Sequence, residues 1–387
     1  MHAFSPDAAR AAELPFTDAR VAAAERAAAA DLPTPAEEIW RYSRIDEFDL
    51  GAYVPGTLTT TVDGGGDLVA DPAAEPALPD VIDGPAPDVF ADLNAAFARA
   101  VLVRVPKGHV ATEPIVVTHH VDGPGVAVFP RLVIDAGDDS EVTVVERFTS
   151  AAGADVLVVP VVQVRAAPAA RVSYLAVNEL ADTAWQIGHQ QAVGDRDSTT
   201  TLATVALGGH YARVRTEARL VGAGGSTRQV ALYFAGGEQM HDFRTIQDHD
   251  APHTTSDLLF KGAVQDESRS VYTGLIKIRK RARGTVAFQT NRNLTLSEGA
   301  WAESVPNLEI ETNDVKCSHA STVGPIDPEQ RFYLESRGIP TQIAERLIVL
   351  GFFDEVLDQL PVGPLAEQLR RRVSAKLDLE RTLTGAA

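Results

Sequence analysis

Cys317 and His319 are the most informative pair of reactive residues in this 387-residue sequence. They lie two positions apart in the segment LEIETNDVKCSHASTVG, and on a β-strand this spacing puts both side chains on one face. A thiolate and an imidazole on one face could ligate a soft metal, or the imidazole could lower the pKa of the thiol. In the structural alternative, Cys317 is a small buried apolar residue and His319 a hydrogen-bonded residue at a sheet edge.

A second group of histidines lies in the segment MHDFRTIQDHDAPHTTSD, which contains His241, His249 and His253. Together with a neighbouring aspartate they have the chemistry of a zinc or iron(II) site. However, His249 and His253 share a face only on a helix, and Pro252 lies between them. We therefore interpret the three histidines as polar residues of a β structure, with a metal site as the alternative.

The sequence lacks the characteristic motifs of several enzyme classes. The sequence contains no G-x-x-x-x-G-K-[ST] motif, so it has no P-loop for nucleotide hydrolysis. The segment VGAGGST has a threonine in place of the third glycine of a dinucleotide fingerprint, and a strand-like pattern follows it. Neither G-x-S-x-G nor H-E-x-x-H occurs.

One basic run stands out in an acidic sequence. In KIRKRARG, Lys277, Arg279, Arg281 and Arg283 alternate, so on a strand they share one face. A solvated outer face is the favoured interpretation, and an anion-binding or partner-binding patch is the alternative.

The predicted type of secondary structure changes twice along the chain. Residues 1–97 begin with an Ala-rich, helix-favouring stretch and continue into a Gly- and Pro-rich linker. Residues 98–322 contain short, β-branched, roughly alternating segments with no helical pattern between them, which excludes a βαβ architecture. A β-sandwich and a β-helix remain open, because the spacing of the segments is irregular. Residues 323–387 return to helix, with Asp327 as an N-cap and Pro328 in the first helical position.

Charge, hydropathy and cysteine content argue against several classes of function. The net charge of −18 argues against non-specific binding to nucleic acid or to anionic lipid. No apolar run approaches the roughly 20 residues of a membrane helix, and the N-terminus does not resemble a secretion signal, so we expect a cytoplasmic protein. A single cysteine cannot hold an iron–sulfur cluster, so any cluster would need ligands from another chain.

Four segments resemble one family. They are LPTPAEEIWRYSRI, FKGAVQDESRSVYTGLIKI, QTNRNLTLSEGAWAESVPNLEIETNDVKCSHASTVGPIDPEQRFYLESRGI and AERLIVLGFFDEVLDQL, and they resemble the SufB/SufD family of iron–sulfur cluster assembly scaffolds. The resemblance implies a mainly β fold, namely a right-handed parallel β-helix flanked by N-terminal and C-terminal helical regions. It therefore favours the β-helix over the sandwich.

Within that family, the single cysteine and the element SHAST, where SufB is expected to carry HEA, resemble SufD. The resemblance implies a non-enzymatic scaffold that pairs with a SufB-like subunit and contacts a SufC-like ATPase through its C-terminal helical region. No cofactor is expected to bind the chain stably by itself. An iron–sulfur cluster or iron would be present transiently at the SufB interface.

The resemblance also implies roles for individual residues. His319 matches the SufD histidine implicated at the SufB interface, and Cys317 matches a neighbouring cysteine, so both are candidate metal ligands. The SufC-docking region corresponds to residues 323–387. Its candidate contact residues are Asp327, Phe332, Tyr333, Arg337, Leu347, Phe352 and Phe353.

Two other functions are kept as alternatives. A SufB-like, self-sufficient scaffold would act as a homodimer that pairs Cys317 and His319 across a two-fold axis, and a homodimer is also an expected state of the isolated chain. A β-helix enzyme unrelated to clusters would need grouped carboxylates or a basic residue in a groove. The low aromatic content, 6%, argues against a carbohydrate-active enzyme.

Overall fold

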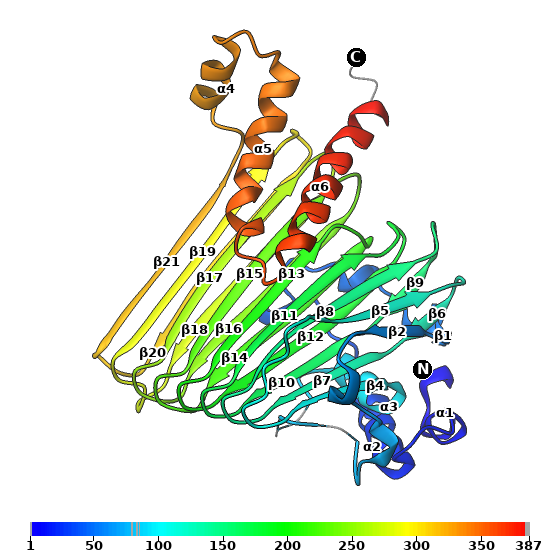
Figure 1. Ribbon diagram of the computed structural model, residues 1–387. Helices are drawn as coiled ribbons and strands as arrows, with labels where there is room; N and C mark the ends of the chain where they lie inside the picture. The colour runs from blue at the N-terminus through cyan, green and yellow to red at the C-terminus, as the bar shows by residue number, and fades with distance from the viewer. Residues whose placement is uncertain (1, 79, 83, 85, 384–387) are drawn as a thin grey trace.

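The computed structural model describes residues 2–383 except 79, 83 and 85. Its centre is a β-solenoid of about eight turns, with helices at both ends of the chain (Figure 1). Strands make up 43% of the residues and helices 23%. These features confirm the mainly β prediction with helical ends, and the stacked parallel strands exclude the sandwich.

Each turn of the solenoid contributes one strand to each of two sheets. The principal strands of the first sheet are β4 (Arg99–Val105), β7 (Pro130–Ala136), β10 (Val161–Ala166), β12 (Trp185–Gly194), β14 (Tyr211–Leu220), β16 (Met240–His249), β18 (Arg269–Ile278) and β20 (Trp301–Ile310). Those of the second are β5 (Ile115–Val121), β8 (Glu141–Ser150), β11 (Arg171–Glu179), β13 (Thr199–Ala206), β15 (Ser226–Ala235), β17 (Thr255–Val264), β19 (Thr285–Thr295) and β21 (Val315–Gly324).

Short strands complete the N-terminal end of the solenoid. The first sheet also contains β1 (Val54–Pro55), β6 (Val126–Val128) and β9 (Val156–Val158), which pair in parallel. In contrast, β2 (Thr59–Asp63) and β3 (Val69–Ala70) pair antiparallel with β5 and β4. The Gly- and Pro-rich segment predicted as a linker therefore forms the edge strands of this end.

Alternating burial and left-handed corners explain why these segments stack. In β5, side chains are buried at every second position, and the apolar ones, Ile115, Val117 and Val121, join one core with apolar residues of the following turns. Corner residues such as Asp139, Asp197 and Asp266 have a φ of 52–57°, a conformation that aspartate tolerates better than most residues. The turns differ in length: Trp185 pairs with Tyr211, whereas Arg269 pairs with Trp301. This variation is why no fixed repeat is visible in the sequence.

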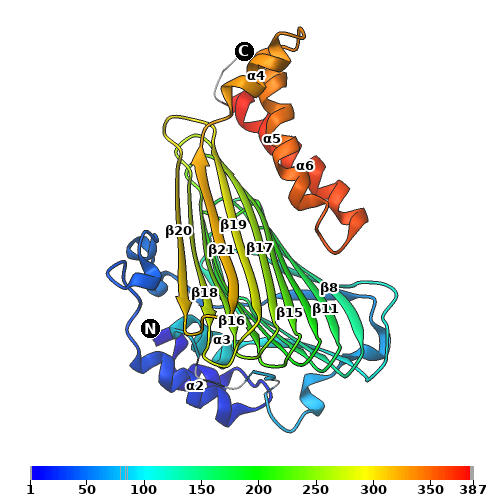
Figure 2. The ribbon, with the colours of Figure 1, turned by 90° about the vertical axis from the view of Figure 1, so that its left-hand side faces the viewer.

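Helices cover two parts of the solenoid (Figures 1 and 2). The N-terminal helices are α1 (Pro6–Ala11), α2 (Thr17–Ala29) and α3 (Val89–Phe97), with 3₁₀ turns at His2–Phe4, Glu38–Trp40, Ile45–Glu47, Leu50–Ala52, Gly66–Leu68 and Pro72–Ala74. The C-terminal helices are α4 (Pro328–Glu335), α5 (Thr341–Leu357) and α6 (Gly363–Leu383). Helices α5 and α6 share a core with β13, β15 and β17. No helix in the described part of the chain is long and apolar enough to cross a bilayer.

Only Lys277 of the basic run lies on a strand, because β18 ends at Ile278, so the prediction of one shared strand face is wrong. The run lies at the surface, and most of it is paired. Arg279 donates two hydrogen bonds of 2.8 Å to the buried carboxylate of Asp248. Arg281 contacts Asp250 at 2.8 Å, and Lys277 contacts a glutamate on β20 at 2.7 Å. These ion pairs connect neighbouring turns, a role that the alternating pattern did not indicate.

Candidate functional site

The solenoid is open at its C-terminal end. Strand β20 pairs only with β18, and β21 only with β19, so among the described residues each has one unpaired edge. Figure 2 shows these two strands side by side at the face nearest the viewer. Unpaired strand edges present free backbone N–H and C=O groups that favour association with another chain.

Both Cys317 and His319 lie on β21 at this open end. Cys317 is in register with Ala287 and His319 with Gln289, which are both buried residues of β19. The predicted shared face is therefore the inward face of the solenoid. His319 is nevertheless exposed, because no further turn covers it.

The thiol of Cys317 is not activated. Cys317 is half-buried and packs against the apolar cluster around Ile278 and Ala287. Burial raises the pKa of the thiol. This direction is opposite to the one expected if the imidazole lowered the thiol pKa.

Apolar residues surround this pair at the open end. Leu308 and Ile310 continue the inward-facing rows of Ile276 and Ile278, yet each is about 40% exposed, as is Val323 on β21. Sequence reasoning missed these residues. Their alternation could have placed them on an inward face, but only the register shows that no described strand follows β20 and β21 in the stack.

A metal at this site would need ligands from elsewhere. Within the described part of the chain, no group of three or more His, Cys, Asp or Glu side chains is arranged to hold a metal ion. Cys317 and His319 provide at most two ligands, fewer than the four of a structural zinc site or a common iron–sulfur cluster.

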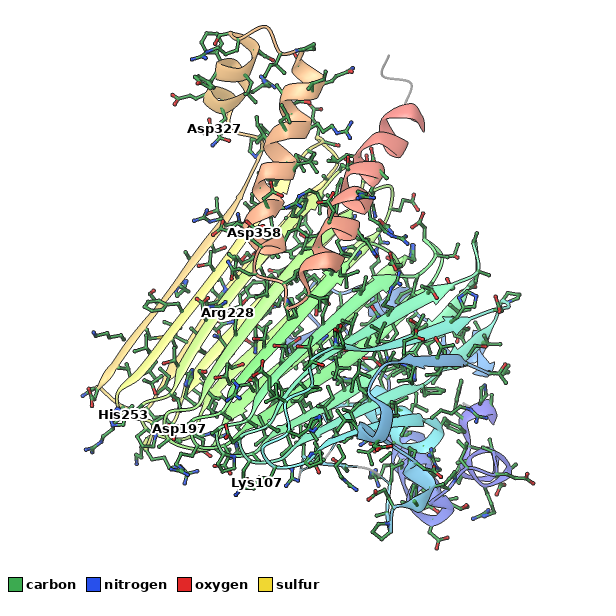
Figure 3. The ribbon with its side chains drawn as sticks, viewed as in Figure 1. Lys107, Asp197, Arg228, His253, Asp327 and Asp358 are labelled. Carbon is green, nitrogen blue, oxygen red and sulfur yellow. The ribbon has the colours of Figure 1, made fainter. Side chains whose placement is uncertain are left out.

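The three histidines of the second group do not form a site. His241 and His249 lie near opposite ends of β16, about 26 Å apart at the usual rise of a strand. Both are buried, and burial lowers the pKa of His241 to about 3 and that of His249 to about 4. His249 bonds to Thr254 and Ser256, whereas His253 is exposed at the corner labelled in Figure 3. The structure therefore agrees with the interpretation of these histidines as polar residues of a β structure.

The C-terminal candidates divide into a surface set and a core set. Asp327 caps α4 through a 2.9 Å bond from the Glu329 N–H, as predicted, at the far end of the strands from His253 (Figure 3). Phe332, Tyr333 and Leu347 are exposed, and the guanidinium of Arg337 lies 4.9 Å from the Tyr333 ring centre.

Two of the C-terminal candidates anchor α5 to the sheet. Phe353 is fully buried against Phe234 of β15, so it belongs to the core and not to a docking surface. The ring of Phe352 lies under the buried ammonium of Lys261, which also bonds to the Phe352 carbonyl at 2.9 Å. A large aromatic residue on an amphipathic helix fits a core or an interface equally well, so sequence alone could not separate these roles.

Comparisons with known proteins identify the family. Residues 119–352 match the family described as SUF system FeS cluster assembly, SufBD core domain. The chain is 33% identical to an iron–sulfur cluster assembly SufBD family protein of Mycobacterium tuberculosis, over 90% of each chain. It is 31% identical to the iron–sulfur cluster assembly protein SufD of Escherichia coli, over 84% of this chain and 78% of that protein. SufD of Bacillus subtilis is also 31% identical, over 74% of this chain and 66% of the relative. The chain therefore belongs to the SufB/SufD family of iron–sulfur cluster assembly proteins, and within this family it resembles SufD.

Proposed function

We propose that this chain is the SufD-like, non-enzymatic subunit of a cytoplasmic SufBCD-type complex. In this proposal, a SufB-like scaffold pairs with its open solenoid end and a SufC-like ATPase docks on α4 and α5. An iron–sulfur cluster, the cargo of the complex, forms transiently beside His319. The likeness to SufD of two bacteria supports the role in cluster assembly.

The open end of the solenoid is the main observation that supports pairing with a SufB-like subunit. An end that leaves two strand edges unpaired and the inward-facing Leu308, Ile310 and Val323 uncovered is costly in water, because both backbone and apolar surface lack partners. A second solenoid with a matching end would pair the edges and bury those residues. His319 would then face the partner across the junction.

The incomplete ligand set agrees with a shared cluster site. Because Cys317 and His319 offer no third ligand, the partner would supply most of the thiolates. His319 is then a candidate ligand or a candidate entry point for iron. Cys317, half-buried with a raised thiol pKa, is the weaker candidate.

We expect the assembly to form when the chain is co-expressed with SufB-like and SufC-like proteins of the same source. Native mass spectrometry should find one copy of this chain, one SufB-like subunit and two SufC-like subunits. Leu308→Asp should prevent pairing with the SufB-like subunit, because it places a charge in the proposed junction. Asn307→Asp, which adds the same charge at the adjacent outward position, is the matched control. Equal pairing by both variants would contradict the proposed junction.

The proposed docking surface for the SufC-like ATPase on α4 and α5 leads to a separate prediction. Leu347→Glu should weaken binding of the SufC-like ATPase at least tenfold, since burial of an unpaired charge at the centre of an interface costs more than about 1.4 kcal/mol. Ala28→Glu on the exposed side of α2 adds the same charge outside residues 323–387. Titration calorimetry with the purified ATPase measures both. If the two variants bind alike, the docking surface lies elsewhere.

A further inference from the structure

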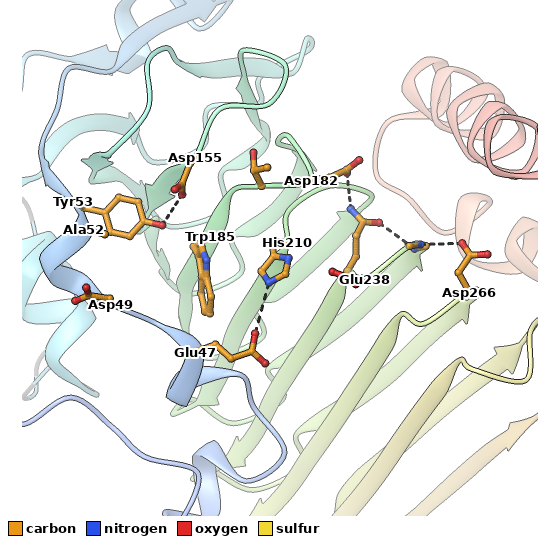
Figure 4. Close-up of a pocket in the computed structure, with 14 residues that line it drawn as sticks. Glu47, Asp49, Ala52, Tyr53, Asp155, Asp182, Trp185, His210, Glu238 and Asp266 are labelled. Carbon is orange, nitrogen blue, oxygen red and sulfur yellow. Dashed lines mark hydrogen bonds and ion pairs between the residues drawn. The ribbon is translucent and has the colours of Figure 1, made fainter. Parts of the chain in front are cut away.

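A large pocket lies at one corner of the solenoid, between the turns of the strands and the N-terminal segment that contains Glu47 and Tyr53 (Figure 4). Its volume is about 870 Å³, which is within the range of pockets that hold a ligand or the side chains of a partner peptide. The pocket lining contains none of the residues proposed above for cluster assembly, so the inference does not depend on that proposal.

Aromatic side chains form two walls of the pocket. Trp185 is only 8% exposed, and its ring centre lies 5.1 Å from those of Phe48 and Tyr211. Tyr53 is also buried, and its hydroxyl donates a 2.8 Å hydrogen bond to Asp155. Rings that are held by the core in this way offer a preformed surface to a cation or to an apolar stem.

The rim of the pocket is strongly acidic. Six carboxylates line it, and no lysine or arginine does; they are Glu47, Asp49, Asp155, Asp182, Glu238 and Asp266. Burial and the nearby Arg44 lower the pKa of His210, so this residue adds no positive charge at neutral pH. Two cations contact the lining residues from outside the pocket: Arg44 bonds to the Glu238 carbonyl, and Lys376 bonds to Gln239. The six carboxylates outnumber these two cations, so the field inside the pocket favours a cationic ligand.

Two of these carboxylates are available to a ligand. Asp155, Asp182 and Asp266 already accept hydrogen bonds from Tyr53, Gln239 and Gly237, in that order. Glu47 is also occupied, because it lies 3.7 Å from Arg44 and 3.8 Å from His210. Glu238 has no side-chain partner among the described residues, and Asp49 accepts only the N–H of Gly51 at 2.8 Å.

A buried donor gives a second, independent indication of a ligand. The indole N–H of Trp185 has no acceptor among the described residues, although the residue is more than nine-tenths buried and lines the pocket. Because Trp185 lines the pocket, its N–H is free to donate to a bound molecule, so the occupant should carry a hydrogen-bond acceptor as well as a positive charge.

We propose that this pocket binds an arginine- or lysine-bearing peptide segment of a protein partner. The cationic side chain would lie between Trp185 and the carboxylates of Asp49 and Glu238, and a peptide carbonyl would accept the indole N–H. A polyamine or a metal ion supplies the charge without the acceptor. In addition, the carboxylates form no group arranged to hold a metal within the described residues.

The test uses titration calorimetry of the full chain with three probes at low salt. These are acetyl-Gly-Arg-Gly-amide, the neutral acetyl-Gly-Gln-Gly-amide and spermidine. The arginine peptide should bind saturably at one site, and the glutamine peptide should not bind. The double variant Asp49→Asn/Glu238→Gln should weaken arginine-peptide binding by about tenfold or more. The double variant Asp63→Asn/Asp67→Asn removes the same charge from exposed positions outside the pocket and should bind normally.

Trp185→Phe tests the donor while it keeps an aromatic wall. It should weaken the arginine peptide several-fold and leave spermidine unchanged, with near-ultraviolet circular dichroism as the check of folding. If this variant unfolds, the wild-type preference for the peptide over spermidine tests the acceptor instead. Absence of peptide binding, equal binding by the pocket and control variants, or tighter binding of spermidine than of the peptide would each overturn the proposal.

Discussion

His319→Ala is expected to reduce cluster formation by the reconstituted complex at least tenfold and to leave the stability of this chain unchanged. The side chain is exposed on β21, and no described residue hydrogen-bonds to its ring. Loss of an exposed, unbonded side chain changes the free energy of unfolding by about 0.5 kcal/mol or less. The loss of an imidazole from a shared metal site, in contrast, removes one of the two candidate ligands that this chain would provide.

The measurement is the visible absorption of clusters formed by the purified complex with an iron salt and a sulfur donor. Ser318→Ala, on the outward face of the same strand, is the matched control and should form clusters normally. Cys317→Ser separates the two candidate ligands, because it removes the thiol and retains His319. Normal cluster formation by His319→Ala in an intact complex would remove His319 from the site.

The order of elements was predictable from the sequence, but the packing of the β region was not. Ala-rich and capped segments predicted the helices at both ends, and short alternating segments predicted strands between them. Alternation shows only that one face is buried, and the inward positions of β5 would look the same in a sandwich. The unequal turns, such as those that join Trp185 to Tyr211 and Arg269 to Trp301, removed the periodic signal. Only the family resemblance separated the two architectures.

The candidate site was predicted in part. The spacing of Cys317 and His319 was enough to place them on one face, because strand geometry fixes that relation locally. Their exposure depends on β21 being the last strand of the stack, which is a property of the whole chain. The pocket beside Trp185 combines the N-terminal segment with several distant turns, so no local pattern could reveal it.

Asp242→Asn is expected to destabilise the fold by about 3–5 kcal/mol, the typical cost of breaking a buried ion pair by removing one partner. The carboxylate of Asp242 is fully buried and accepts hydrogen bonds of 2.6 Å from Arg213, 2.8 Å from Arg244 and 2.7 Å from the Tyr211 hydroxyl. Both guanidinium groups are almost fully buried as well. Asparagine would leave two buried positive charges without the carboxylate that both of them contact.

The same arginines attach the N-terminal segment to the solenoid. Arg213 lies 3.8 Å from the Trp40 ring centre and donates a 2.7 Å bond to the carbonyl of Ile39. Arg244 donates a 2.6 Å bond to the carbonyl of Arg41. We therefore expect Asp242→Asn to release this segment first, which limited proteolysis would detect as faster cleavage near residue 41.

The destabilisation should depend on pH in a defined direction. Burial alone would raise the pKa of Asp242, but Arg213 and Arg244 hold it below its usual value. A carboxyl group with a depressed pKa stabilises the fold above its unfolded pKa of about 3.9 and loses that contribution as the pH falls through the folded pKa. The difference between wild type and Asp242→Asn should therefore be constant near neutral pH and shrink below about pH 4.

Urea unfolding at pH 7 and at lower pH measures this difference. Glu217→Gln is the matched control, because it also replaces a carboxylate by an amide but lies in a partly exposed pair, 3.2 Å from Arg215. It should cost about 1 kcal/mol or less. If Asp242→Asn cost no more than Glu217→Gln, the buried network would be tolerated without its central charge.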